Sequence, residues 1–335
     1  MSPLSALKTT TLNSFALHCG LATASTKAAR VAAIAHLGQP FQHILGHSGD
    51  SLRVVSVDVG LKNFAYCRAS YSGASAALHG WDVVNLHQKF GDASDALAAD
   101  SVDSKVYLAR LAVAVVDEIL LAGDVPHVVT VESQRTRSNS NKVTLPNVLL
   151  NFSFEHMLYA VLAARQSRNA SLAPITVVPM NSKKMVNFWL ARYVEMKRLK
   201  PAQSKGLRTA LLYSWLLHNE YCPFDMTSLL RQIPPEFGLL AASRKVRVLT
   251  ETLRLESVPK KVDDMVDSFL YNMAIAKHIQ RYQEILECER TTLAYQSLIE
   301  TWDRQHCRYL TAFLSDTGSQ PSSAYSAITK TDIKS

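Results

Sequence analysis

Acidic residues stand directly after two apolar runs of the sequence. Asp58 follows Val-Val-Ser-Val, and Glu132 follows Val-Val-Thr-Val. Both runs are rich in β-branched residues, which predicts buried strands. Burying an unpaired carboxylate is costly, whereas α/β sheets bind ligands at strand ends. One such acid is most often a strand-end residue that faces water, but two of them together predict a shared cation site.

A third group of acids lies in the segment Lys260-Lys-Val-Asp-Asp-Met-Val-Asp-Ser268. In a helix, Asp267 shares a face with Asp263, four residues earlier, and with Asp264, three residues earlier. Like charges at these spacings repel each other. Asp263 and Asp264 could instead compensate the helix dipole in a first turn, but Asp267 lies one turn further in, among apolar residues. A bound divalent cation would relieve the repulsion.

Mg²⁺ is the cation that these acids predict, and Mn²⁺ can replace it. Mg²⁺ prefers a few carboxylates together with water and substrate phosphates. Two such ions about 4 Å apart can activate a water and stabilise the leaving oxygen in phosphodiester hydrolysis. The candidate catalytic residues are therefore Asp58, Glu132, Asp267 and one or both of Asp263 and Asp264, between which the spacing does not decide.

The charge of the chain favours a polyanionic partner. It has 36 Lys and Arg against 28 Asp and Glu, a formal charge of +8, and such an excess favours nucleic acid or an anionic membrane. Residues 181–210 hold one acid, Glu195, and eight basic residues: Lys183, Lys184, Arg192, Lys197, Arg198, Lys200, Lys205 and Arg208. A solvated helix face and a phosphate-binding surface explain this stretch equally well. Among these residues, Lys183, Lys184, Lys197 and Arg198 are our candidates for DNA contacts.

Other candidate DNA contacts lie next to the acids in the sequence: Lys62, Gln134, Arg135, Arg137, Lys260 and Lys261. Guanidinium groups can bind phosphates through two parallel hydrogen bonds. For each of these residues a surface salt bridge is an equally good explanation.

Several other functions are not supported by the sequence. No run approaches the roughly 18 consecutive apolar residues that a membrane span needs. The five cysteines lie far apart, without zinc-ligand spacing or a disulfide pattern. The 12 glycines are not clustered, so the chain lacks the phosphate loops of actin-like ATPases and sugar kinases. We therefore expect neither a membrane partner nor a small-molecule cofactor.

The order of the expected elements predicts an α/β fold with a mixed sheet flanked by helices. Strands are expected at 53–58, 63–68, 76–84, 127–132 and 174–178. The longer helices are expected at 102–121, 145–164, 182–194, 205–220, 263–286 and 292–314. Residues 1–40 form a separate helical module, 41–51 a linker and 52–314 the main domain. The Ser- and Thr-rich residues 315–335 are expected to be disordered.

Three separated motifs resemble the fungal mitochondrial Holliday-junction resolvases, relatives of bacterial RuvC. They are Ser56-Val-Asp-Val-Gly-Leu-Lys-Asn-Phe-Ala-Tyr66, Val131-Glu-Ser-Gln-Arg-Thr-Arg-Ser138 followed by Met157-Leu-Tyr-Ala-Val161, and Lys260–Ser268. The resemblance implies an RNase-H-like fold, a homodimer, Mg²⁺ dependence and paired symmetrical nicks across four-way junction DNA. It places the metal-binding acids on Asp58, Glu132, Asp263 and Asp267, whereas the spacing in bacterial relatives selects Asp264.

The N-terminus suggests a second DNA-binding unit and a location. Leu7–Leu21 and Ser25–Ala29 resemble a SAP motif, a small helical DNA-binding unit found in yeast members of the family. No acid precedes Asp50, and acid-poor, hydroxyl-rich starts are typical of mitochondrial transit peptides. If residues 1–40 fold as a SAP-like module, their lack of acids is weaker evidence for a transit peptide. The expected mitochondrial location therefore rests mainly on the family resemblance.

Two other functions remain compatible with the sequence. A nuclease of the same fold with another substrate would use the same acids, because substrate choice depends on the dimer and the basic surface. A non-catalytic nucleic-acid-binding protein on this scaffold would have no reason to keep the whole set of acids.

Overall fold

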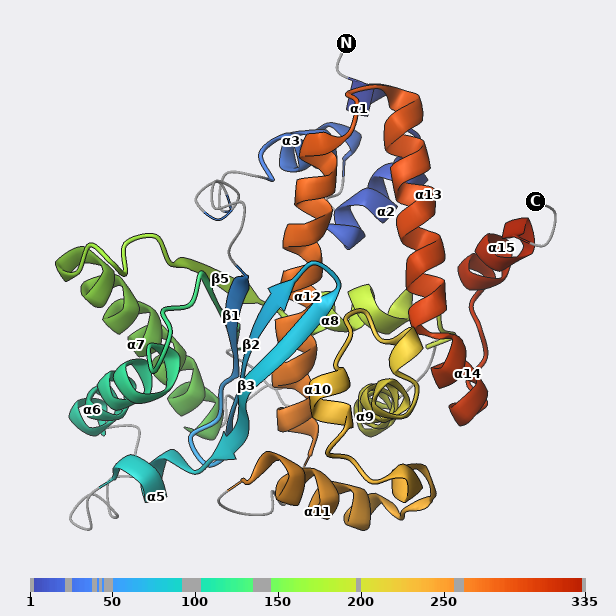
Figure 1. Cartoon of the computed structure of the whole chain (residues 1–335). Coiled ribbons are helices and arrows are strands. Elements are labelled where there is room, and N and C mark those ends of the chain that lie inside the picture. The colour runs from blue at the N-terminus through green and yellow to red at the C-terminus, as the bar shows by residue number, and fades with distance from the viewer. Residues whose placement is uncertain are drawn as a thin grey trace.

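The computed structural model describes residues 3–21, 26–37, 41, 44, 51–91, 104–134, 146–196, 200–255 and 262–332. Its centre is a five-stranded sheet of order β3-β2-β1-β4-β5 (Figure 1). The strands are β1 (Leu52–Asp58), β2 (Phe64–Ser72), β3 (Ser75–Val84), β4 (Val128–Glu132) and β5 (Thr176–Met180). β1, β2 and β3 are antiparallel neighbours, while β4 and β5 run parallel to β1. This is the mixed sheet expected from the sequence.

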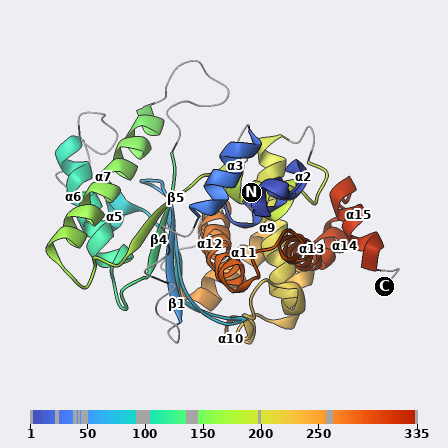
Figure 2. The ribbon, with the colours of Figure 1, turned by 90° about the horizontal axis from the view of Figure 1, so that it is seen from above.

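Helices cover both faces of the sheet. On one face lie α6 (Lys105–Val115), its π-helical continuation η3 (Val116–Leu120) and α7 (Pro146–Arg168). On the other lies α12 (Asp263–Glu287), and the view from above shows the sheet edge-on between the two layers (Figure 2). The expected helices at 102–121, 145–164 and 263–286 are therefore present. α12 is buried along most of its length, which explains why its apolar residues occupy all sides of the helix.

Buried hydrogen bonds fix α12 on the sheet. The amide nitrogen of Asn272 lies 2.8 Å from the carbonyl oxygen of Cys67 on β2 and 3.0 Å from Oγ of Ser56 on β1. The hydroxyl of Ser56 donates to the carbonyl of Ser268 at 2.7 Å, and that of Tyr71 donates to Oδ1 of Asn272 at 2.6 Å. Losing any partner would leave a buried polar group unsatisfied. The rotation of α12 about its axis is thereby determined, and with it the direction of its acidic side chains.

Further helical elements surround α12 and the sheet. They are α5 (Leu86–Phe90), α8 (Ser182–Val186), η4 (Asn187–Ala191), α9 (Pro201–Leu217), η5 (Asn219–Tyr221), α10 (Thr227–Leu230), η6 (Pro235–Leu239), α11 (Ala242–Leu253), α13 (Thr292–Tyr309) and α14 (Thr311–Thr317). The expected helix 292–314 is thus two helices, which meet at Leu310. None of the described helices is long and apolar enough to cross a membrane.

The C-terminal segment differs from the expected disordered tail. Residues Ser323–Asp332 form a helix, α15. Before it, the backbone of residues 320–322 pairs with residues 193–195: the Glu195 amide donates to the Gln320 carbonyl at 2.9 Å, and the Ser322 amide to the Tyr193 carbonyl at 2.9 Å. Tyr325 and Ile328 then pack against the main core. The prediction of disorder was wrong because composition does not reveal these backbone partners.

The N-terminal helices α1 (Pro3–Ala6), α2 (Thr9–His18) and α3 (Lys27–Ala35) share a core with the C-terminal helices. Leu7, Leu12 and Phe15 are fully buried against Tyr295 and Trp302 of α13, and Figure 1 shows α2 between α12 and α13. The expected separate module therefore packs tightly on the main domain. Of the expected linker 41–51, Phe41 and Ile44 are buried, and residues 42–43 and 45–50 lie outside the described part of the chain.

A buried carboxylate joins this N-terminal unit to the body. Asp303 on α13 accepts hydrogen bonds from Ser14 of α2 at 3.0 Å, from the Tyr193 hydroxyl at 2.8 Å and from Arg192 at 2.8 Å. Nε2 of His18 lies 2.8 Å from the same carboxylate. Burial alone would raise the pKa of Asp303, but His18, Arg192 and Tyr193 hold it well below its usual value. The contact binds α2 to the rest of the molecule.

Three buried histidines surround this contact. Burial lowers the pKa of His18, and it lowers the pKa of His306 well below 6.5. The pKa of His278 is lowered to about 4, mainly by burial and also by the charges of Lys184 and Arg281, although a hydrogen bond to the His18 carbonyl opposes the shift. The His278 ring is therefore neutral in the folded protein near pH 7.

We predict that the free energy of unfolding decreases as the pH falls from 7 to 5. The unfolded histidines take up protons near pH 6.5, whereas the folded His278 does so only near pH 4. Each affected histidine contributes a loss of up to about 1.4 kcal/mol per pH unit. Urea denaturation at several pH values measures this slope. His278→Asn should reduce it and a change of the exposed His156 to Asn should not; equal slopes for all three proteins would contradict the prediction.

Candidate active site

The structure brings together four carboxylates from three elements. Asp58 ends β1 and Glu132 ends β4, while Asp264 and Asp267 lie in the first two turns of α12. β1 and β4 are parallel, and Val57 and Val131 are partners in the register. The two strand-end acids therefore lie side by side at one edge of the sheet. The hydrogen bonds of Asn272 place the start of α12 against the same edge.

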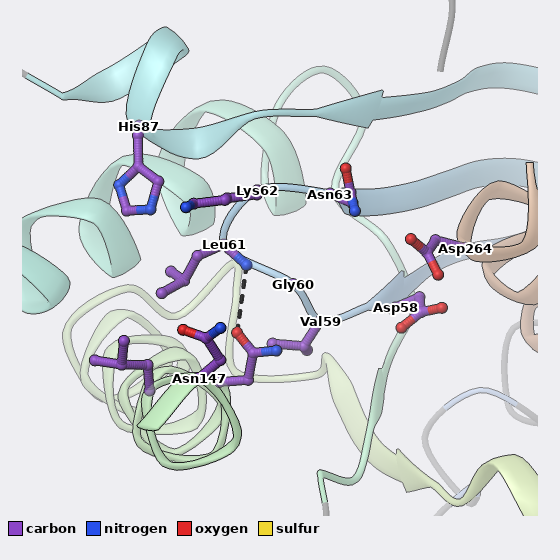
Figure 3. A pocket seen from close by; sticks show the side chains of 11 residues that line it. Asp58, Val59, Gly60, Leu61, Lys62, Asn63, His87, Asn147 and Asp264 are labelled. Atoms are coloured by element: carbon purple, nitrogen blue, oxygen red, sulfur yellow. Dashed lines mark hydrogen bonds between the residues drawn. The ribbon is translucent and has the colours of Figure 1, made fainter. Parts of the chain in front are cut away.

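The electrostatics of Asp58 show how closely these acids are gathered. Its pKa is raised well above the usual value, first by burial and then by the neighbouring carboxylates of Glu132, Asp267 and Asp264. Asp58 and Asp264 lie at one end of the cavity in Figure 3. Repulsion between carboxylates that share a site raises the pKa values of its members. A divalent cation would stabilise their ionised forms.

The structure separates the two neighbouring acids of α12. Asp264 lines the cavity that also contains Asp58. Asp263 points to α9, where Lys205 forms an ion pair with it. The geometry therefore favours Asp264 over Asp263 as a companion of Asp58. The resemblance placed a metal ligand on Asp263, and that assignment stays a prediction.

Asp267 has a partner that the sequence analysis missed. Arg208 of α9 donates from Nε to one carboxylate oxygen at 2.6 Å and from a terminal nitrogen to the other at 2.7 Å. Both side chains are less than 10% exposed. The sequence analysis assigned Arg208 to the basic stretch. Lys205 and Arg208 are three residues apart, whereas the acids that they contact, Asp263 and Asp267, are four residues apart, and nothing in the sequence shows that the two helices meet.

Gln134, Glu155 and Tyr271 lie around Glu132. The amide of Gln134 donates to the Glu132 carboxylate at 2.9 Å, while the backbone nitrogen of Gln134 donates to Glu155 of α7 at 2.8 Å. Tyr271 of α12 is buried beside the acids, and burial together with Glu132, Asp58 and Asp267 raises the pKa of its hydroxyl well above 10. Glu155 and Tyr271 were not predicted from the sequence, because each lies within an otherwise ordinary helical pattern.

A cavity of about 270 Å³ extends from the acids along the loop after β1. It is lined by Asp58, Val59, Gly60, Leu61, Lys62, Asn63, His87, Asn147, Leu150, Asn151 and Asp264. The Leu61 amide donates to Asn151 of α7 at 3.4 Å, the dashed line in Figure 3. The Cβ of a residue larger than glycine at position 60 would lie 2.9 Å from the Asn63 carbonyl oxygen, so the tight loop requires Gly60. Lys62, a candidate DNA contact, thereby lies in the same cavity as two of the acids.

The basic stretch 181–210 is not one surface. Lys183 and Lys184 are exposed on α8. Arg192, Lys205 and Arg208 instead pair with Asp303, Asp263 and Asp267, so these three basic side chains already have acidic partners inside the protein. The acids that pair with these residues are distant in sequence and close only in the fold. The remaining candidate contacts lie outside the described residues: Arg135, Arg137, Lys197, Arg198, Lys260 and Lys261.

The carboxylates of these acids are suitable ligands for a hard divalent cation. Within the described residues, no three Asp, Glu, His or Cys side chains converge closely enough to hold an ion as they stand. Oxygen ligands of this number and charge suit Mg²⁺, and burial together with the neighbouring carboxylates raises the pKa of Asp58 well above its usual value. Asp58, Glu132, Asp264 and Asp267 are the residues that would hold such an ion.

We predict that Asp58→Asn stabilises the metal-free protein. Burial and the neighbouring carboxylates raise the folded-state pKa of Asp58, so this group opposes folding near pH 7.5, and a neutral amide removes that cost. The gain should appear as a higher melting temperature than that of wild type. Thermal unfolding in EDTA measures it, with Glu118→Gln, a change of an exposed side chain on η3, as the control, expected to change stability by less than about 0.5 kcal/mol. Destabilisation by Asp58→Asn would mean that Asp58 has a favourable partner instead.

Comparison with known proteins gives consistent matches. Residues 54–285 match the model of a family described as mitochondrial resolvase Ydc2 / RNA splicing MRS1. Two proteins named cruciform cutting endonuclease 1, mitochondrial, are similar to the chain. The Saccharomyces cerevisiae protein is 21% identical over 255 residues, which cover 70% of this chain and 71% of that protein. The Schizosaccharomyces pombe protein is 31% identical over 145 residues, which cover 41% of this chain and about half, 52%, of that protein.

Two solved structures are also similar. The crystal structure of the yeast mitochondrial Holliday junction resolvase Ydc2 is 19% identical, with a TM-score of 0.48, and the match covers 90% of this chain and 99% of that one. RuvC of T. thermophilus in complex with a Holliday junction substrate is 13% identical, with a TM-score of 0.29, and the match covers 68% of this chain and 95% of that one.

Proposed function

The chain belongs to the mitochondrial resolvase Ydc2 / RNA splicing MRS1 family, and from this membership and its acids we propose that it is a metal-dependent endonuclease that cuts four-way DNA junctions. The observation that carries the proposal is the gathering of Asp58, Glu132, Asp264 and Asp267 at one edge of the sheet. Placing these charges together is costly without a cation. The relatives named cruciform cutting endonuclease support the choice of substrate.

The reaction we propose is hydrolysis of one phosphodiester bond in each of two opposed strands. The carboxylates of Asp58, Glu132, Asp264 and Asp267 would hold Mg²⁺, or Mn²⁺ in its place, with Gln134 orienting Glu132 through its hydrogen bond. Such an ion would supply Lewis-acid activation of water and positive charge beside the leaving oxygen. Lys62 lies in the cavity beside the acids and contacts a phosphate next to the scissile bond.

Binding of the junction arms requires a wider basic surface. We assign to it the exposed Lys183 and Lys184 of α8 together with the residues outside the described part of the chain: Arg135, Arg137, Lys197, Arg198, Lys260 and Lys261. Symmetrical cleavage needs two copies of the site, so we also propose a homodimer with two-fold symmetry. The SAP resemblance of the N-terminal helices suggests that they contribute further contacts with DNA. The names of the relatives support a mitochondrial location.

RNA binding without cleavage is the alternative within the family, because its description also includes an RNA-splicing protein. A binding scaffold needs basic surface but no cluster of mutually repelling carboxylates. The raised pKa of Asp58 therefore favours hydrolysis over binding alone.

A substrate panel tests the proposed function. We expect purified protein with Mg²⁺ to nick a synthetic four-way junction at paired positions, and to leave linear duplex, RNA–DNA hybrid and structured RNA largely uncut. Asp58→Asn, Glu132→Gln and Asp267→Asn should each abolish cleavage while the junction is still bound in a gel-shift assay. Preferential cutting of the hybrid would indicate a different nuclease. Wild-type cleavage rates from Asp58→Asn would remove Asp58 from the site.

The roles of the two neighbouring acids of α12 can be separated in the same assay. We expect Asp264→Asn to lose nearly all cleavage at saturating Mg²⁺, because Asp264 shares the cavity with Asp58. Asp263→Asn should retain most activity, because its main contact is with Lys205. Circular dichroism of both variants controls for folding. Complete loss from Asp263→Asn with an intact fold would assign Asp263 as a ligand, as the family resemblance implies.

A further inference from the structure

We propose that Arg208 caps Asp267 in the metal-free protein, and that a divalent cation binds this carboxylate only after the guanidinium has moved away. Arg208 would thus lower the affinity of the free protein for metal. This inference rests on the proposed function, since it concerns regulation of the same site.

The geometry leaves Asp267 without a free oxygen. Nε of Arg208 lies 2.6 Å from one oxygen and a terminal nitrogen lies 2.7 Å from the other, a two-point arrangement that occupies the carboxylate in its plane. Arg208 is 6% exposed and Asp267 is also 6% exposed. Ser204, one turn earlier on α9, lies 3.3 Å from the third guanidinium nitrogen. The cap is therefore a buried, anchored contact, unlike a surface ion pair.

The other acids of the cluster differ in this respect. Neither Asp58 nor Glu132 has a basic residue bound to its carboxylate among the contacts of the described chain, and Glu132 accepts from the neutral amide of Gln134. Arg208 also lies near Asp58. Burial lowers the pKa of the Arg208 guanidinium, but Asp267 and, to a smaller extent, Asp58 raise it above its usual value. The positive charge of Arg208 is thus held next to the clustered carboxylates, where a divalent cation would bind. Metal and guanidinium compete for the same oxygens of Asp267.

Substrate offers a new partner for the displaced side chain. Guanidinium groups bind phosphate oxygens in the same two-point geometry as carboxylates, and a DNA phosphate at the acids would lie within the neighbourhood of α9. Transfer of Arg208 from Asp267 to this phosphate would free the carboxylate for metal. By thermodynamic linkage, DNA would then increase the affinity for metal, and metal the affinity for DNA. The free protein would be kept from assembling a complete metal site.

Metal titration of the free protein tests the cap without measuring cleavage. Mn²⁺ is titrated calorimetrically into metal-free wild type and Arg208→Met. We expect the Met variant to bind Mn²⁺ at least about tenfold more tightly, because tenfold corresponds to only about 1.4 kcal/mol and breaking a buried ion pair costs more than that. We also expect it to melt at a lower temperature than wild type in EDTA and to be stabilised more by Mn²⁺.

Arg192→Met is the matched control, because Arg192 also pairs with a partly buried aspartate, Asp303, away from the acids. It should lower the melting temperature and leave the affinity for Mn²⁺ unchanged. If Arg208→Met does not fold, Arg208→Lys provides the test: one ammonium group cannot bind both oxygens, so Mn²⁺ should again bind more tightly than to wild type. In Arg208→Met combined with Asp267→Asn, the gain in affinity should disappear.

The outcomes separate this inference from the proposed function. Unchanged or weaker Mn²⁺ binding by folded Arg208 variants, in a protein that cuts junctions with Mg²⁺, overturns the cap alone. Absence of both Mn²⁺ binding and junction cleavage in wild type overturns the proposed function and the cap with it. Tighter binding by both Arg208 and Arg192 variants would indicate a general loosening of the fold, and would also reject the cap.

Discussion

The position of α12 on the sheet is the constraint on which the candidate site depends. Asn272 is fully buried, and its side chain lies within hydrogen-bonding distance of groups on both β1 and β2. Rotating α12 by one residue would break these bonds and bury unsatisfied carbonyl groups. Five residues before Asn272, Asp267 is thereby held against the strand ends that carry Asp58 and Glu132. A polar contact inside the core thus determines where the charged groups meet.

Gathering the acids creates repulsion that the surrounding helices only partly offset. Arg208 and Lys205 of α9 pair with Asp267 and Asp263, while Asp58 keeps a strongly raised pKa. Sites that bind hard cations commonly accept such a cost, because the ion repays it when it binds. The same balance links stability to function: changes that relieve the repulsion should stabilise the empty protein and impair its chemistry.

The helices outside the sheet show how far the fold extends beyond the segment matched by the family. The match ends at residue 285, yet α13 supplies Trp302 to the core beneath α2, and Asp303 to a polar contact with His18. The N-terminal and C-terminal parts therefore stabilise each other. Any contact that the N-terminal helices make with DNA would be held rigidly relative to the acids, in contrast to a module on a flexible linker.

The sequence by itself determined the sheet, its two strand-end acids and the buried acidic helix, because β-branched runs and helical spacing reflect local burial. Only the tertiary structure decided which acids have partners. Arg208 and Asp267 are 59 residues apart in the sequence. Many basic and acidic residues at such a separation make no contact, so no local pattern distinguishes an arginine that caps an acid from one that binds DNA. The orientation of α12 likewise directs Asp264 into the cavity and leaves Asp263 with Lys205. Which basic residue pairs with which acid depends on how the helices pack, and the local spacing of residues in the sequence does not show that packing.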